Sequence, residues 1–418
     1  MALTIAVLKE TGKNETRVAA TPETVKKYIA AGASVQIEAD AGSAARILDD
    51  AFKDAGAKIC KSAADTLKGA HIVLKVAPPD VKEIEALPSG CLFLSLINPY
   101  QNEKLIAAFA KNKIDAFAME LIPRISRAQS MDVLSSQSNL AGYKAVLDAC
   151  EYYTRAMPMM MTAAGTVPPA KVFVLGAGVA GLQAIATAKR LGGVVSATDV
   201  RPAAKEQVES LGASFIAVED EEFKAAETAG GYAKEMSKEY QKKQADLVAE
   251  HIKKQDIVIT TALIPGRPAP KLLTEAHIKS MKPGSVIVDL AAVQGGNAEL
   301  TETGKVVTKH DVTIIGHENF PARLGTDASA LYAKNLLNLL NLLLDKEKGE
   351  LAIDWEDEIV KGIALTKDGK IIHPNFADVK TDSKPAKAKE GENEKEADKK
   401  PAKKTSSKKD KEEKETKE

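Results

Sequence analysis

The pattern that most constrains the fold is an alternation of short β-branched runs with alanine-rich helical stretches. Strands that alternate with helices are typical of βαβ units, which build parallel sheets covered by helices. The runs form two sets, at residues 5–7, 35–37, 72–76, 92–96 and 115–118, and at residues 171–175, 194–198, 214–217, 256–260, 285–290 and 312–315. We therefore expect an α/β protein with two doubly wound, Rossmann-like domains.

Residues 120–169 separate the two sets and contain no strand-like run. A helical pattern covers residues 135–154 of this gap, and a second long one, at 328–344, follows the last strand. We expect these two long helices to cross between the domains beside a cleft. The expected first domain is residues 1–134 plus 325–380, and the expected second domain is residues 135–324.

Residues 381–418 differ in composition from the rest of the chain. They contain 13 Lys against 11 Asp or Glu, no aromatic residue and nothing more apolar than alanine. Such a segment cannot bury enough apolar surface to offset its ordering entropy, so we expect a disordered charged tail. A solvated tail is a simpler interpretation than a segment that binds a partner or an anionic surface, because its two charge signs are interspersed.

Composition excludes several classes of function. Lys plus Arg and Asp plus Glu each number 58, and this balance argues against a general binder of nucleic acid or membrane surfaces. Three scattered cysteines, Cys60, Cys91 and Cys150, form neither a disulfide framework nor a CxxC metal site. No secretory signal opens the chain, and we expect no direct membrane insertion because the sequence contains no run of about 20 apolar residues.

A nucleotide-binding pattern opens the second set of strands. The run at 171–175 leads directly into Gly176, Gly178 and Gly181 in GxGxxG spacing, with Val179 and Ala180 between the last two, and then into an alanine-rich helix. The first glycine permits the tight turn, the second lets the backbone approach a pyrophosphate, and the third allows the helix to pack on the strand. A turn with incidental glycines is the alternative.

The next strand ends at Asp199, 18 residues after Gly181, where the acid that binds the adenosine ribose is expected. A carboxylate at this position favours NAD(H) over NADP(H). Val200 and Arg201 follow it, and Arg201 leaves a second reading open, since an arginine can accommodate the 2′-phosphate or cap the next helix. NAD(H) binding is the strongest inference from the residues alone.

Catalytic acid–base groups are harder to find. The six histidines form no spaced cluster, and we predict no metal site. Polar side chains gather instead in the gap between the domains, where they suit a polar ligand such as a nicotinamide with its ribose. An N-capping loop would need only Ser135 and Ser136, and the segment also carries Arg124, Arg127, Gln129 and Asp132.

A glycine pair precedes an aromatic residue at Gly230, Gly231 and Tyr232, inside a charged stretch without a strand pattern. Such a stretch suits a mobile flap that closes on a ligand. An ordinary flexible insertion fits its composition nearly as well.

Over residues 1–380 the sequence resembles the soluble NAD(H)-binding component of the proton-translocating NAD(P) transhydrogenases, in the form made as a separate polypeptide. The resemblance rests on five motifs: PRISRAQSMD from Pro123, SSQSNLAGY from Ser135, GAGVAG from Gly176, TALIPG from Thr261 and VDLAA from Val288.

The resemblance implies that Arg124, Gln129 and Asp132 form a loop that arranges the nicotinamide at the site of hydride transfer. Arg127 and Ser135 would also contact the nucleotide, and Asp199, Val200 and Arg201 would bound the adenosine ribose. It further implies a mobile loop over bound nucleotide with Gly231, Tyr232 and, near its end, Gln244, and an approach of Leu263 to the cofactor.

Alanine dehydrogenase shares the fold and is the rival reading. Lys75 matches that family's lysine for the keto acid, but residues 92–98 lack the histidine expected there. Without this histidine, the reaction would lose the contribution of proton transfer to its rate, which is about 10²–10⁴-fold. Direct hydride transfer between two nicotinamides needs no such group, only near-attack geometry and exclusion of water.

Transhydrogenation needs two nucleotide sites, and this chain carries one fingerprint. The resemblance therefore implies that a beta subunit holds NADP(H), that a membrane-spanning subunit moves protons, and that this chain forms a homodimer. We expect a cytoplasmic protein held at the inner membrane through those partners. A non-catalytic NAD sensor, in which the tail is the functional part, is a rival from another class.

Overall fold

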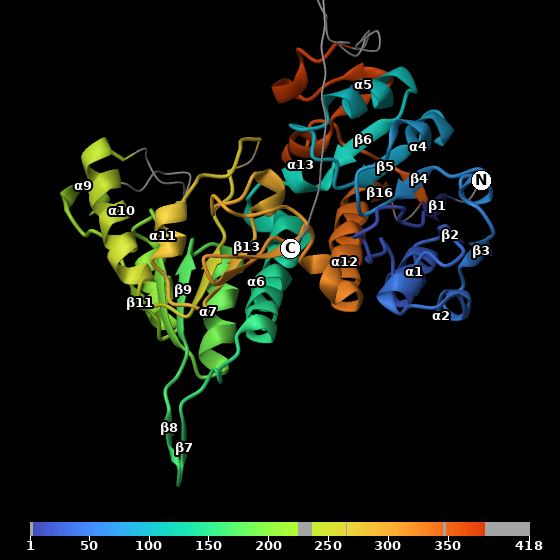
Figure 1. Cartoon of the computed structure of the whole chain (residues 1–418). Helices are drawn as coiled ribbons and strands as arrows, with labels where there is room; N and C mark the ends of the chain where they lie inside the picture. The colour runs from blue at the N-terminus through green and yellow to red at the C-terminus, as the bar shows by residue number, and fades with distance from the viewer. Residues whose placement is uncertain (1–2, 225–235, 265, 346–347, 381–418) are drawn as a thin grey trace, which may run out of the picture. The chain divides into compact units, whose positions relative to one another are not determined.

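The computed structural model describes residues 3–224, 236–264, 266–345 and 348–380, so the predicted tail lies outside the described residues. The predicted α/β fold with two parallel sheets is confirmed (Figure 1). The first sheet has the order β3-β2-β1-β4-β5-β6 and is parallel throughout. Its strands are β1 Thr4–Val7, β2 Ser34–Glu38, β3 Lys58–Cys60, β4 Ile72–Leu74, β5 Leu92–Ser95 and β6 Asp115–Ala118.

The helices of the first sheet begin at recognisable caps. Thr21 accepts a hydrogen bond from the Thr24 backbone and forms a capping box before Pro22, and Asp80 does the same with Glu83. These helices are α1 Pro22–Ala30, α2 Asp49–Asp54, α3 Ala63–Thr66, α4 Val81–Ala86 and α5 Glu103–Lys111, with a short 3₁₀ turn, η1 Ser43–Ala45.

The second sheet has the order β11-β10-β9-β12-β13-β15-β14, with only β14 antiparallel to its neighbour. Its central strands are buried along their length, as expected for a parallel sheet covered on both faces. The strands are β9 Lys171–Leu175, β10 Val194–Thr198, β11 Ser214–Phe215, β12 Ile257–Thr260, β13 Val286–Asp289, β14 Val306–Lys309 and β15 Val312–Ile315. The accompanying helices are α7 Val179–Arg190, α8 Ala204–Ser210, α9 Glu221–Lys224, α10 Lys238–Ile252, α11 Glu275–Lys279 and η4 Ala292–Gln294.

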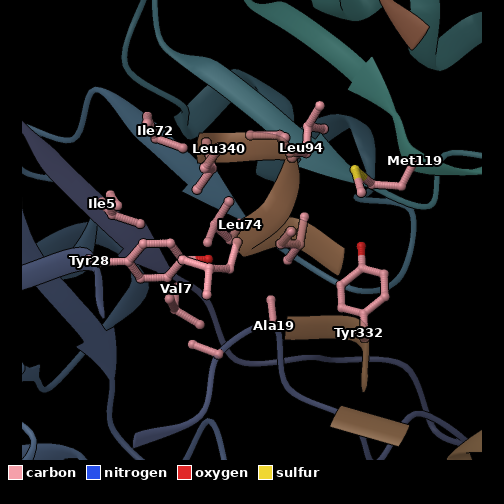
Figure 2. Packing of buried hydrophobic residues seen from close by; sticks show 14 of the residues in the cluster. Ile5, Val7, Ala19, Tyr28, Ile72, Leu74, Leu94, Met119, Tyr332 and Leu340 are labelled. Atoms are coloured by element: carbon pink, nitrogen blue, oxygen red, sulfur yellow. The ribbon is translucent and has the colours of Figure 1, made fainter. Parts of the chain in front are cut away.

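Two long helices connect the sheets, α6 Val133–Tyr152 and α12 Gly325–Leu343, and they pack against each other (Figure 1). Helix α12 belongs to the core of the first sheet, where Tyr332 and Leu340 lie among strand residues such as Ile5 and Leu74 (Figure 2). Helix α6 contributes alanines such as Ala145 to the core of the second sheet. The apolar stripe of each helix therefore faces a different sheet.

The chain after α12 returns to the first sheet. The Leu365 amide donates to the carbonyl of Ala116 in β6, and the Thr366 hydroxyl donates to the carbonyl of Ile114. This region contains β16 Leu344–Asp345, β17 Glu350–Leu351, α13 Glu358–Ile363, β18 Thr366–Lys367, β19 Lys370–Ile371 and η6 Pro374–Phe376. The domain boundaries given above stay predictions.

The sequence pattern missed eight strands of the described residues, which are β3, β7, β8, β14 and the two-residue strands β16, β17, β18 and β19. Strand β3 has three residues, and β14 is an edge strand whose ladder forms only against β15. The region expected to lack strands holds a hairpin of β7 Met160–Thr162 and β8 Gly165–Val167, which projects from the second sheet (Figure 1). All three residues of β7 are exposed, so no apolar alternation marks it.

No helix among the described residues is long and apolar enough to cross a membrane.

Candidate functional site

The glycine turn joins β9 to α7 and has the geometry that each glycine requires. Gly176 has a φ of +101°, in the left-handed region that favours glycine. A Cβ at Gly181 would lie 1.8 Å from the Gly176 carbonyl oxygen, so a side chain there would force the turn apart. A Cβ at Gly178 would meet nothing within 4 Å. The backbone is thus exposed where a pyrophosphate would approach, and the turn fits a dinucleotide.

The start of α7 is also suited to an anion. Its N-cap is Gly178, and no side chain of the described residues caps it. The first backbone amides of a helix have no partner within the helix, and together with the helix dipole they attract phosphate. The Val179 side chain at this end is 42 % exposed.

Asp199 and Arg201 lie beside the turn as a preformed pair. The Asp199 carboxylate accepts the Ala177 amide at 2.7 Å, which ties the end of β10 to the glycine turn. Arg201 donates from Nε to Oδ1 and from Nη2 to Oδ2 of Asp199, each at 2.9 Å. The arginine is therefore held by the acid, and a ribose hydroxyl would share Asp199 with it. Val200 between them is exposed.

Gln244 on α10 binds the same edge of the sheet. Its amide donates to the Thr198 hydroxyl at 3.0 Å, next to Asp199, and its oxygen accepts the Val218 amide at 2.9 Å. Leu263 follows β12 and is 46 % exposed. Gly231 and Tyr232, the predicted flap residues, lie outside the described residues.

The polar segment before α6 forms a 3₁₀ stretch, η3 Ser126–Met131, and Asp132 is the N-cap of the helix. The Asp132 carboxylate accepts both the backbone amide of Ser135, at 2.9 Å, and its hydroxyl. The cap is therefore Asp132, where the sequence suggested Ser135 or Ser136. Arg124 and Gln129 are exposed, as residues that meet a ligand would be.

Arg127 has a partner that the sequence did not reveal. Its guanidinium donates to both carboxylate oxygens of Asp357, from Nη1 and Nη2, each at 2.8 Å. The hydrogen bond from Arg127 lowers the pKa of Asp357. Asp357 is also the N-cap of α13 and lies 230 residues away in the chain, so no local pattern could have linked the two.

Helix α6 joins the polar segment to the glycine turn. Ser135 lies in its first turn, and Gly142 lies two turns later. A Cβ at Gly142 would be 2.0 Å from the carbonyl oxygen of Ala180, so α6 crosses the start of α7 at backbone contact. The glycine in the SSQSNLAGY motif is thus needed for this close approach.

Lys75 is not available to a ligand in this structure. Its side chain is 1 % exposed, and Nζ lies 2.8 Å from Glu83 Oε1 and 3.6 Å from Glu10 Oε2. Burial raises the pKa of Glu10 to about 7, although Lys75 opposes the shift. No group of three or more His, Cys, Asp or Glu within the described ranges could hold a metal ion.

Comparison with known proteins places these features in a family. The family model described as "Alanine dehydrogenase/PNT, N-terminal domain" matches residues 6–141, and "Alanine dehydrogenase/PNT, C-terminal domain" matches residues 145–374. A relative from Rhodospirillum rubrum, the first of the separate parts of NAD(P) transhydrogenase subunit alpha, is 56% identical to the chain over 375 residues. The match covers 88% of this chain and 98% of that relative.

Two further matches cover the two branches of this family. A solved transhydrogenase structure from Sinorhizobium meliloti superposes with a TM-score of 0.81 at 55% identity, covering 88% of this chain and 100% of that one. An alanine dehydrogenase of Methanococcus maripaludis is 31% identical over 310 residues, covering 73% of this chain and 76% of the relative. The transhydrogenase matches are longer and more similar.

Proposed function

Since the chain belongs to the alanine dehydrogenase/transhydrogenase family, we propose that it is the NAD(H)-binding component of a proton-translocating NAD(P) transhydrogenase. The observation that carries the proposal is the glycine turn, whose open side at Gly178 meets the uncapped start of α7 beside Asp199. This arrangement supplies backbone amides for a pyrophosphate and a carboxylate for a ribose.

Bound NADH would supply a hydride from C4 of its dihydronicotinamide ring. The residues of this chain would bind the nucleotide, orient its reacting ring and shield that ring from water. Gly176, Gly178 and Gly181 would seat the pyrophosphate on α7, and Asp199, Val200, Arg201 and Gln244 would bound the adenosine end. The nicotinamide end would be oriented by Arg124, Gln129 and Asp132. The residues around it would be Arg127, Ser135, Leu263 and, in the flap, Tyr232. Correct orientation of the reacting ring is the main contribution that a direct hydride transfer requires.

Lys75 favours this branch of the family over amino-acid dehydrogenation. The lysine that would bind a keto acid is closed off by two carboxylates, Glu10 and Glu83. No histidine occurs at residues 92–98 to transfer a proton. Reduction of a keto acid with ammonium would therefore lack both groups.

The acceptor in this proposal is NADP⁺ on a beta subunit, and proton movement takes place in a membrane-spanning subunit. The chain would act as a homodimer and associate with the membrane through those partners. The name of the Rhodospirillum rubrum relative, which describes one portion of a subunit alpha, supports a multi-subunit enzyme.

A spectroscopic assay tests the proposal. The full chain is titrated with NADH by fluorescence, and then assayed with pyruvate and ammonium alone, and with a purified NADP(H)-binding transhydrogenase subunit and thio-NADP⁺. We expect NADH binding, no oxidation with pyruvate and ammonium, and NADH-dependent reduction of thio-NADP⁺ with the partner. NADH oxidation with pyruvate and ammonium by the chain alone would contradict the proposal, and binding without transfer would favour an NAD sensor.

A further inference from the structure

The carbonyl oxygen of Ser130, the residue after Gln129, is held by two side-chain amides of α12. Asn335 Nδ2 donates to it at 2.9 Å and Asn338 Nδ2 at 3.0 Å. The two asparagines are three residues apart and lie on one face of the helix. Both donors therefore converge on a single backbone atom of the polar segment. We call Asn335 and Asn338 the α12 amide pair.

Asn335 is an unusual residue for its surroundings. It is 6 % exposed, and its neighbours in α12, Leu336 and Leu339, are fully buried in the core of the first sheet. A buried amide without hydrogen bonds is costly. The other end of Asn335 accepts the Ser136 hydroxyl at 2.7 Å. Its amide thus bridges Ser130, at the end of η3, and Ser136, in the first turn of α6.

A second attachment holds the other end of η3. The bidentate pair of Arg127 with Asp357 fixes this end to the start of α13. Asp357 is 14 % exposed, and it is itself held by the Ile359 amide. Gln129 lies between the two attachments. The chain is thus attached to the first-sheet half of the molecule on both sides of this exposed side chain, through the Arg127 side chain before it and the Ser130 carbonyl after it.

We propose that the α12 amide pair consists of positioning residues that set the place of Gln129 at the hydride-transfer site. This inference rests on the proposed function, because it gives Gln129 the role described there. The pair acts through the backbone of Ser130 and does not touch the nucleotide. Loss of one amide would let the 129–131 backbone shift, and a misplacement of about 1 Å at a reacting centre can cost about 10²-fold in rate.

Three variants of the full chain test the pair. Asn338→Ala removes one donor at a half-buried position, and Asn335→Leu replaces the buried amide with an apolar side chain of the same heavy-atom branching. Asn341→Ala is the matched control, on the same helix one turn further along and exposed. Each is assayed for its melting temperature, its Kd for NADH, its transfer rate to thio-NADP⁺ at saturating nucleotide with the partner subunit, and amide hydrogen exchange of residues 126–131.

We expect Asn338→Ala to slow transfer about 10-fold and Asn335→Leu up to about 100-fold. The Kd for NADH should change less than about 3-fold, and exchange of residues 126–131 should accelerate in both variants but not in Asn341→Ala. Unchanged transfer in a folded Asn338→Ala variant, or transfer that falls only in parallel with NADH affinity or melting temperature, would overturn the inference. So would unchanged exchange.

Failure of the proposed function gives a different result. In that case the wild-type chain itself would transfer no hydride to thio-NADP⁺ with the partner subunit. Hydrogen exchange would still report, independently of activity, whether the α12 amide pair holds residues 126–131.

Discussion

Arg201 binds the carboxylate of Asp199 by donating two hydrogen bonds, from Nε to Oδ1 and from Nη2 to Oδ2, each 2.9 Å long. The acid that would select NAD(H) therefore also neutralises a nearby cation that could accept the 2′-phosphate of NADP(H). If the proposed nucleotide site is correct, the pair would set nucleotide preference at this edge, because either residue changes the charge that the other presents.

Removal of the acid should change both affinity and preference. Asp199→Ala should weaken NADH binding about 10-fold or more, since hydrogen bonds to a charged group contribute about 1.5–3 kcal/mol. It should also release Arg201 from this pair, so that affinity for NADPH rises relative to NADH. Fluorescence titrations with both nucleotides measure this. The double variant Asp199→Ala/Arg201→Ala should lose the gain for NADPH, and a gain that persists would show that Arg201 is not its source.

Two glycines of the turn should respond differently to the same added methyl group. Gly178→Ala should fold normally, because its Cβ would lie in open space, yet bind NADH at least about 10-fold more weakly because the methyl fills the pyrophosphate position. Gly181→Ala should lower the free energy of unfolding by roughly 1–3 kcal/mol, because its Cβ would lie 1.8 Å from the Gly176 carbonyl oxygen. Denaturant unfolding and NADH titration separate the two effects. Normal NADH affinity in Gly178→Ala would place the pyrophosphate elsewhere.

Gln129 should matter for transfer more than for binding. Gln129→Asn shortens an exposed side chain by one methylene and leaves the backbone bonds of Ser130 in place. We expect a transfer rate at least about 10-fold lower, with a smaller change in the Kd for NADH. Gln207→Asn, the same change at an exposed glutamine on α8, is the control. A wild-type rate in Gln129→Asn would show that its assignment to the hydride-transfer site is wrong.

Titration of Glu120 should make the free energy of unfolding depend on pH. Its carboxylate accepts the Ile97 and Asn98 amides through Oε1, and burial raises its pKa from 4.5 to about 7. Between these values the folded chain holds a proton that the unfolded chain releases. The stability due to this proton is therefore full below pH 4.5 and is lost as the pH rises to about 7.

The wild-type free energy of unfolding should thus fall, relative to Glu120→Gln, by on the order of 1–3 kcal/mol across this window. Urea unfolding at pH values of about 4.5, 5.5 and 7 measures the difference. Glu85→Gln, at an exposed carboxyl of α4, should track the wild type. Parallel curves for wild type and Glu120→Gln would mean that Glu120 titrates normally.

The sequence could predict what local patterns encode. The two parallel sheets follow from the alternation of buried strands with helices, and the glycine turn follows from its place between a strand and a helix. In both cases the signal lies within about 30 residues, since one βαβ unit contains it. The hairpin of β7 and β8 was not predicted, because its exposed residues show no alternation of apolar and polar side chains.

Contacts between distant segments could not be predicted in this way. Asp357 binds Arg127 across 230 residues, and Asn335 binds Ser130 across 205. The sequence shows an asparagine in a leucine-rich helix but not the carbonyl that it reaches. The approach of Glu10 to Lys75 likewise depends on the fold, because Glu10 follows β1 and Lys75 follows the neighbouring strand β4.

The most direct test of hydride transfer from NADH to NADP⁺ follows the transferred hydrogen with an isotope label. The full chain with its NADP(H)-binding partner is supplied with NADP⁺ and with NADH that carries deuterium at both C4 positions, and the NADPH formed is examined by mass spectrometry and NMR. Direct hydride transfer predicts one deuterium at C4 of every NADPH, and none taken from solvent when unlabelled NADH is used in D₂O. NADPH without the label, or with solvent deuterium at C4, would contradict direct hydride transfer.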